Sequence, residues 1–336
     1  AQIGIHNLNG AVSALQSVIA ENRAGSDGGG IWNNGSLALT ITNIYRNEAD
    51  ADGDGFGAGG GIYSDGATSR VTLTDTAVIS NTAQDGGGLC SLDGILTIHT
   101  GQVSENVSGG SGAGIYNEGI ALLETTTIEA NFAAWDGGGI INTNQATLTI
   151  TGTGILHNEA RGLNGGGGIF IFDSSATLTN STVAYNSASE ADGGGIWSGM
   201  TLALANVTLS GNSARARGGG LFISFGSTAT LTHTSVAFNE AVMGTGGGLY
   251  QKEQTVVTLR NSVVSDNTGE NCAGLGSVTS PGYNLDSDDT SQLAGTGDLV
   301  QTDPLLGPLQ DNGGATETHA LLSGSPAANA IPPDHC

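Results

Sequence analysis

Three aspartates at alternate positions are the residues of this chain best suited to hold a metal ion. Asp50, Asp52 and Asp54 are followed by Gly55. This spacing matches the first half of a D-x-D-x-D-G calcium loop, in which alternate carboxylates converge on the ion and glycine makes the turn. The twelfth position carries Gly61 instead of the usual bidentate glutamate. We therefore predict a candidate Ca²⁺ site at the three aspartates, with a solvated acidic loop as the alternative.

Aromatic side chains recur at one position of the sequence pattern. Each follows an isoleucine or leucine that comes directly after a glycine run, and together they form the aromatic stripe: Trp32, Tyr63, Tyr116, Phe170, Trp197, Phe222 and Tyr250. Neighbouring residues on a strand point to opposite faces. If the aliphatic residues fill an interior, the aromatic stripe faces outward, and we expect it to form a ligand- or partner-binding surface.

Three interpretations of the aromatic stripe are open. The C-terminal segment could cover it, because that segment carries several leucines. A second copy or another protein could bind it, because large exposed apolar patches usually mark interfaces. A glycan could stack on it, because flat aromatic faces suit amphipathic sugar rings.

Acidic residues could also serve a glycosidase, which needs two carboxylates in a groove. Aspartates precede several glycine runs, at Asp27, Asp85, Asp136 and Asp192. Other repeats have different residues at this place, namely Ala58, Ser111 and Arg217. A lyase acting on uronates needs cationic side chains, and the 8 lysines and arginines are spread along the chain. We expect no enzymatic activity, with a polysaccharide lyase or hydrolase as the minority interpretation.

These residues belong to an internal repeat with two columns. Glycine runs followed by Ile or Leu recur every 25 to 31 residues. A second column reads aliphatic-x-x-Asn and places asparagine at Asn22, Asn47, Asn81, Asn106, Asn131, Asn158, Asn186, Asn212, Asn239 and Asn267. Between the columns lie alternating stretches such as 37–42, which are typical of half-buried strands.

A period of this length, with three short strands and no helical pattern, predicts an all-β, right-handed parallel β-helix of about ten three-strand coils. Equivalent residues of successive coils then lie about 4.8 Å apart. The aliphatic columns would fill the interior. The asparagine column would form an internal structural ladder, because each amide can both donate and accept.

Composition limits the partners. The formal net charge is −23, and only 8 residues are lysine or arginine. Binding of duplex nucleic acid is therefore not expected, because phosphate recognition depends on clustered cations. No apolar run is long enough to span a bilayer, and no signal peptide is recognisable. The chain begins at Ala1 instead of Met, so we expect a processed, exported protein whose signal and anchor are not part of this chain.

The paired Gly-Gly-Gly-Ile/Leu and aliphatic-x-x-Asn columns resemble the Gly-Gly-Ala-Ile and Phe-x-x-Asn repeats of polymorphic outer-membrane proteins. They are also similar to bacterial right-handed β-helix proteins with a "choice-of-anchor" C-terminal region. The likeness covers 19–275 by repeat and extends through the tail segments 282–288, 302–314 and 324–327. It implies a secreted or surface-displayed protein of adhesive or structural role. Such relatives tend to carry cysteine where Ser291 stands, so Cys272 lacks its expected partner.

The predicted organisation has three parts. Residues 1–18 are a lead-in segment and partial cap, 19–276 are the solenoid, and 277–336 are a loop-rich tail. Solenoid ends expose unpaired strand edges, and the short N-terminal segment caps them weakly. We therefore expect a non-catalytic extracellular or cell-surface protein, structural or adhesive, that can self-associate into fibres. A carbohydrate-active β-helix using the aromatic stripe is the alternative.

Overall fold

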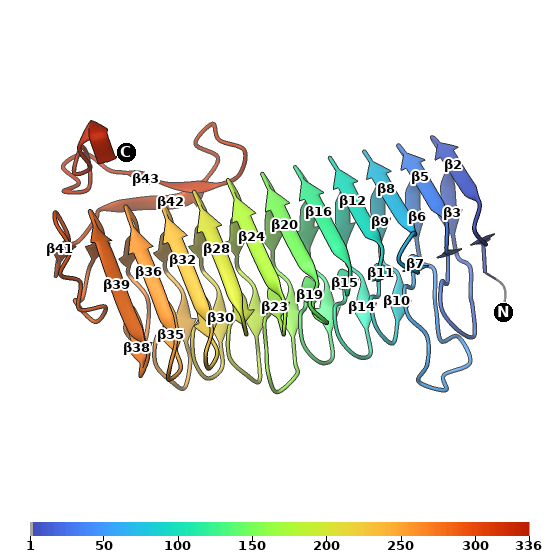
Figure 1. The fold of residues 1–336 in the computed structure, drawn as a ribbon, viewed down its shortest axis with the longest axis horizontal. Coiled ribbons are helices and arrows are strands. Elements are labelled where there is room, and N and C mark those ends of the chain that lie inside the picture. Colours follow the sequence, from blue (N-terminus) through green and yellow to red (C-terminus); the bar gives the residue numbers. More distant parts are fainter. Residues whose placement is uncertain (1–2, 336) are drawn as a thin grey trace.

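Each turn of the chain contributes one strand to each of three long parallel sheets, so the molecule is a β-solenoid of about ten coils (Figure 1). The structure is a computed structural model that describes residues 3–335. The predicted all-β solenoid is confirmed. No helix within the described residues is both long enough and apolar enough to cross a membrane.

The first sheet carries the residues that follow the glycine runs. Its strands pair in register, so that Ile31 lies beside Ile62 and Ile62 beside Leu89. In spatial order they are β1 (Ile5–Asn7), β4 (Ile31–Asn33), β7 (Ile62–Asp65), β11 (Leu89–Leu92), β15 (Ile115–Asn117), β19 (Ile140–Asn142), β23 (Ile169–Ile171), β27 (Ile196–Ser198), β31 (Leu221–Ile223), β35 (Leu249–Gln251) and β38 (Cys272–Gly274).

The second sheet contains the longest regular strands, which are the alternating stretches of the sequence. Two side chains of each strand point inward, as Leu37 and Leu39 do in the second coil. The strands are β2 (Ala11–Leu15), β5 (Ser36–Thr40), β8 (Arg70–Thr74), β12 (Ile95–His99), β16 (Ile120–Glu124), β20 (Thr147–Thr151), β24 (Ser175–Thr179), β28 (Thr201–Ala205), β32 (Thr228–Thr232), β36 (Val256–Arg260) and β39 (Ser277–Gly282).

The third sheet contains the aliphatic residue that precedes each asparagine by three positions. Its strands are β3 (Val18–Ala20), β6 (Asn43–Tyr45), β9 (Ala77–Ile79), β13 (Gln102–Ser104), β17 (Thr127–Glu129), β21 (Gly154–Leu156), β25 (Thr182–Ala184), β29 (Thr208–Ser210), β33 (Ser235–Ala237), β37 (Val263–Ser265), β40 (Leu285–Asp286) and β41 (Leu299–Val300). Together the inward side chains of the three sheets form one continuous core.

A fourth, narrower sheet runs between the third and the first, and the repeat pattern does not predict it. Its seven strands are β10 (Thr82–Ala83), β14 (Val107–Ser108), β18 (Phe132–Ala133), β22 (Glu159–Ala160), β26 (Ser187–Ala188), β30 (Ser213–Ala214) and β34 (Glu240–Ala241). Strands of two residues are too short to carry an alternating pattern, and the recurring alanine is the inward residue of each pair except in β14, where serine takes that place.

The ten asparagines of the repeat stack as one ladder along the interior. In each neighbouring pair the Nδ2 of one coil donates to the Oδ1 of the next, at 2.8 to 3.0 Å. The same Oδ1 accepts the main-chain N–H of the preceding ladder asparagine, as Asn186 does from Asn158 at 2.9 Å. Eight of the ten side chains are almost inaccessible to solvent.

The residue before each ladder asparagine has a left-handed backbone. Its φ lies near +55°, and examples are Glu105, Ala130 and Tyr185. Only Gly211 in this column is glycine. Such a conformation costs about 1 kcal/mol or more for residues with a Cβ. The ladder offsets this cost, because it fixes the corner through several buried hydrogen bonds.

Glycine is required at the other corner for a different reason. The first glycine of a run has positive φ, as Gly193 does at +68°. The second approaches the backbone of the next coil so closely that a Cβ at Gly194 would lie 2.5 Å from Gly219 O and would also contact Ser213 O. The glycine run therefore lets two coils touch through their main chains.

The two ends of the solenoid differ, and both extend past the predicted boundaries. Strands β1, β2 and β3 pair in parallel with β4, β5 and β6, so residues 5–18 belong to the first coil and are not a separate lead-in. At the other end β39, β40 and β41 continue the coil to Val300. Leu293 packs against the core there, so a loop closes this end.

The remaining tail forms an antiparallel hairpin, β42 (Leu306–Gln310) and β43 (Thr318–Leu321), and a short 3₁₀ helix, η1 (Pro333–His335). It lies on the outer face of the third sheet. Thr182 Oγ1 donates to Glu317 O at 2.6 Å, and Ser210 Oγ lies 2.9 Å from His319 Nε2. The tail therefore packs back over the later coils (Figure 1).

Candidate functional site

The side chains of the aromatic stripe leave the outer face of the first sheet and stack along the rod. Ring centres lie 4.5 Å apart for Phe170 and Trp197, 6.0 Å for Trp197 and Phe222, and 5.5 Å for Phe222 and Tyr250. Parallel strands in register impose this stacking, because each ring repeats at the same place in the next coil. The result is a second, narrow apolar cluster outside the main core.

The rings of the aromatic stripe have little contact with solvent. Phe222 is inaccessible to solvent, Tyr63, Phe170 and Trp197 are buried, and the other three rings are half-buried. The interpretation in which the C-terminal tail covers the stripe is wrong, because the tail packs on the third sheet. Neighbouring rings and the flanking corners cover it instead; Phe172, for example, stacks 6.3 Å from Phe170.

The N-terminal half of the stripe is acidic. Cys90 is buried between Tyr63 and Tyr116 in adjacent strands. Burial raises the pKa of the Cys90 thiol well above its ordinary value, and nearby carboxylates add to this effect. Tyr116 donates a hydrogen bond to Glu118 at 2.9 Å, and burial raises the pKa of the Tyr116 hydroxyl. Neither the thiol nor the phenol is therefore activated as a nucleophile.

The aspartates that precede the glycine runs bond to the backbone of the next coil. Asp27 accepts the N–H of Ala58 at 2.8 Å, and Asp85 accepts that of Ser111 at 2.7 Å. Burial raises the pKa of Asp85, and the Ser111 hydrogen bond opposes this rise. These carboxylates link successive corners, which is a structural use.

The same column continues through two further aspartates. Asp136 accepts the N–H groups of Asn164 and Gly165 at 3.1 and 2.9 Å. Asp192 forms a two-pronged ion pair with Arg217, with N–O distances of 2.8 and 3.0 Å. The carboxylates of this column thus have protein partners.

The C-terminal half of the stripe carries cations. The Arg217 guanidinium carbon lies 4.9 Å from the centre of the Tyr250 ring. The Lys252 ammonium lies 5.4 Å from the centre of the Phe222 ring. A cavity of about 220 Å³ opens beside them. The repeat pattern does not predict this cavity, because Lys252 lies in the turn after the strand; the single lysine of an acidic chain is the one available signal.

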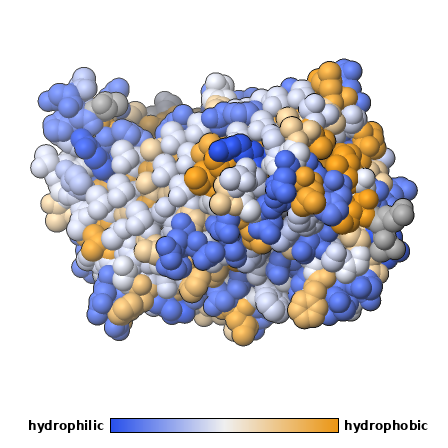
Figure 2. All heavy atoms as spheres, turned by 45° about the vertical axis from the view of Figure 1, so that its right-hand side comes forward, coloured by the Kyte–Doolittle hydropathy of each residue, from blue (hydrophilic) through white to orange (hydrophobic). Residues whose placement is uncertain are grey.

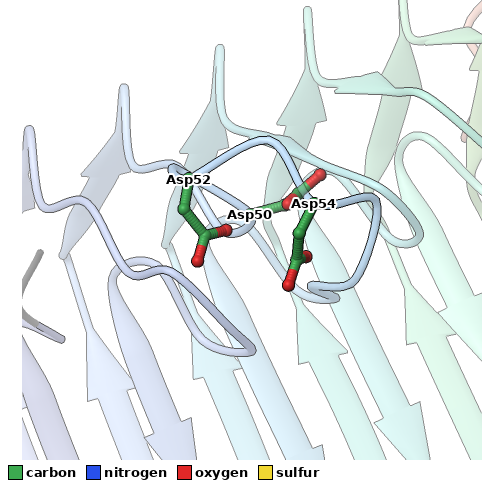
Figure 3. Close-up of side chains that lie close together, drawn as sticks. All are labelled: Asp50, Asp52 and Asp54. Atoms are coloured by element: carbon green, nitrogen blue, oxygen red, sulfur yellow. The ribbon is translucent and has the colours of Figure 1, made fainter.

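The three candidate calcium ligands lie on one loop that projects between β6 and β7 (Figure 3). One carboxylate oxygen from each of Asp50, Asp52 and Asp54 lies within 4.8 Å of the others. Asp50 Oδ1 accepts the N–H of Gly55 at 3.1 Å, and Asp54 Oδ1 accepts that of Phe56 at 2.9 Å. The oxygen-only donor set fits a hard cation such as Ca²⁺. No fourth His, Cys, Asp or Glu side chain joins the three among the described residues.

The tail also forms hollows against the third sheet, and the one over its middle coils is the larger. A cavity of about 550 Å³ lies where its turn stands over the third sheet, between Thr125–Thr127 and Ala315–Glu317. Its lining is mixed polar and apolar, and its acidic side chains are Glu129 and Glu317. The arrangement contains no paired acid and base.

Comparison with known proteins supports the fold and does not indicate a function. A family model described as "Right handed beta helix region" matches residues 138–291. No curated protein and no solved structure matches the chain. The part of the solenoid from Gly138 to Ser291 is therefore similar to the right-handed β-helix family.

Proposed function

We propose that this chain is a non-catalytic extracellular or cell-surface β-helix with a structural or adhesive role. The observation that carries the proposal is the use of the aspartates that precede the glycine runs. Asp27, Asp85 and Asp136 accept main-chain hydrogen bonds from the next coil, and Asp192 is paired with Arg217. The one recurring column of aspartates that the sequence offered for glycosidase proton transfer is thus occupied in holding coils together.

The location outside the cell rests on composition and on the repeat. An acidic surface with one lysine suits an exported protein, and the paired columns resemble those of polymorphic outer-membrane proteins and "choice-of-anchor" surface proteins. A long rod also suits a protein displayed on a cell surface. Its asparagine ladder and its apolar core run without interruption through the coils. The role proposed is therefore that of a stiff spacer or contact surface.

Self-association is proposed through the N-terminal end. Leu8, Leu15 and Val18 are each more than half exposed there. Figure 2 shows apolar side chains gathered towards this end, which that view turns forward. Exposed apolar patches of this kind usually mark interfaces. At the other end of the solenoid, the loop that carries Leu293 packs against the core.

Electron microscopy of the purified chain, together with a product assay on a panel of polysaccharides, tests this function. We expect rods that pair end to end at high protein concentration, and no released sugar. Leu15→Asp should keep the rods single. Release of reducing or unsaturated sugars would contradict the non-catalytic role, and single rods at all concentrations would contradict self-association.

A carbohydrate-active β-helix is the second candidate. The cationic and aromatic cavity beside Arg217 and Lys252 favours it. A glycan array separates this candidate from a purely structural rod, because only a carbohydrate-binding chain is retained on the immobilised glycans.

We also propose that Ca²⁺ binds the Asp50 loop weakly. Three carboxylates without a bidentate glutamate predict a Kd on the order of 1 mM, as in weak extracellular sites. Isothermal titration should give one site per chain, and Asp52→Asn should remove it. Asp93→Asn, an exposed aspartate elsewhere, is the matched control. Equal heats for wild type and Asp52→Asn would contradict the site.

A further inference from the structure

Positive charge is scarce in this chain, yet two cations lie over the same ring. There are 8 Lys and Arg against 31 Asp and Glu. The Arg217 guanidinium carbon and the Lys252 ammonium lie 5.3 and 5.4 Å from the centre of Phe222. Aromatic faces attract cations, and Phe222 is held in the stripe with no accessible surface. Both cations are therefore placed on a rigid support.

The two cations are not equally free. Arg217 is bound by both oxygens of Asp192. Lys252 has no carboxylate within ion-pair distance among residues 3–335. Its main chain is nevertheless fixed, since its N–H donates to Ile223 O at 2.9 Å and its carbonyl accepts Thr255 Oγ1 at 2.7 Å. The ammonium is available to an external anion.

The adjoining cavity combines charge with apolar and hydrogen-bonding groups. Its volume is about 220 Å³, and its lining consists of Arg217, Phe225, Tyr250, Lys252, Glu253 and Leu275. Phe225 is 57% exposed and Leu275 is 73% exposed, so both present apolar surface at the rim. Glu253 offers a hydrogen-bond acceptor beside them. The space suits one six-membered ring and is too small for a folded peptide or a nucleotide.

We propose that this cavity binds a single acidic sugar residue, of the hexuronate class. The sugar carboxylate would pair with the Lys252 ammonium. An apolar ring face would lie against Phe225, and ring hydroxyls would donate to Glu253. A net charge of −23 repels long polyanions, so a free monosaccharide or a chain end fits better than the interior of a polyuronate. This inference names the ligand class for the cavity that favours the second candidate function, and it does not depend on the proposed structural role.

Titration with glucuronate and with glucose, followed by ligand-observed NMR at low salt, tests the site. We expect glucuronate to bind about fivefold more tightly than glucose, which is the upper limit of what one partly exposed charge pair allows. Lys252→Gln should abolish that preference, and Arg260→Gln, an exposed cation on β36, should keep it. Circular dichroism checks that both variants are folded.

Equal binding of glucuronate and glucose would overturn the proposal, and so would a preference that survives Lys252→Gln. A short oligogalacturonide distinguishes the sources. One bound terminal residue per chain indicates a polysaccharide end, and binding of the monosaccharide alone indicates a free sugar. Contacts along several sugar residues would contradict a one-ring site. These results do not affect the test of rod assembly. The sugar-binding proposal and the self-association proposal can therefore be contradicted independently.

Discussion

Replacing Asn158 by alanine should lower the free energy of unfolding by about 3–5 kcal/mol, because several buried polar groups lose partners at a cost of about 1–3 kcal/mol each. Asn158 Nδ2 donates to Ile128 O and to Asn186 Oδ1, both at 2.9 Å. Its Oδ1 accepts from Asn131 N at 3.1 Å and from Asn131 Nδ2 at 2.9 Å. Urea unfolding followed by circular dichroism measures the change.

Asn43→Ala is the matched control. Asn43 lies on β6 with an exposed side chain, so its loss should change stability by about 0.5 kcal/mol or less. Asn158→Asp is a sharper probe, since a carboxylate of the same shape cannot donate either hydrogen bond and would bury a charge. If Asn158→Ala unfolds at the same urea concentration as Asn43→Ala, the ladder does not stabilise the coil.

Replacing Gly194 by alanine should have an effect of similar or larger size. The added Cβ would lie 2.5 Å from Gly219 O and in contact with Ser213 O. Both contacts are main-chain atoms of neighbouring segments, so no side chain can move aside. Overpacking in a core costs about 1–3 kcal/mol, and a rigid backbone on both sides places this site at about 3 kcal/mol or more. Soluble yield and thermal midpoint measure it.

Gly314→Ala tests whether glycine loss by itself is harmful. The nearest atom to a Cβ there is Thr316 O, at an ordinary 3.5 Å. We expect the thermal midpoint of this variant to stay close to that of the wild type. A Gly194→Ala protein that is as soluble and as stable as Gly314→Ala would mean that the coils can separate at this corner.

The fold was predictable because the same residue types recur in about ten repeats of similar length. The column of Ile31 and its equivalents and the column of Asn158 and its equivalents each needed the same environment in every coil, and only stacked coils provide it. The fourth sheet was not predictable, since pairs such as Thr82–Ala83 have no periodicity. The first coil was missed because residues 5–18 lack both columns.

The candidate site was predictable only in part. The outward direction of the stripe follows from strand alternation at Trp197 and its equivalents. Its covering depends on how the corners fold, which the repeat does not specify. The cavity beside Lys252 depends on a contact between Arg217 of the preceding coil and Tyr250. A contact between two coils cannot be read from one repeat alone.

The asparagine ladder gives the rod a chemical polarity. Every amide-to-amide hydrogen bond of the ladder donates towards the C-terminal end. Asn22 Oδ1 therefore accepts no hydrogen bond from another ladder amide among the described residues, while Asn271 ends the series by donating to Asp286 at 2.7 Å. Two rods that meet N-terminus to N-terminus would bring two acceptors together, and their ladders could not join. Such a pair would meet through apolar side chains and the free edges of β1, β2 and β3, without a shared ladder. It should separate readily, unlike a fused solenoid.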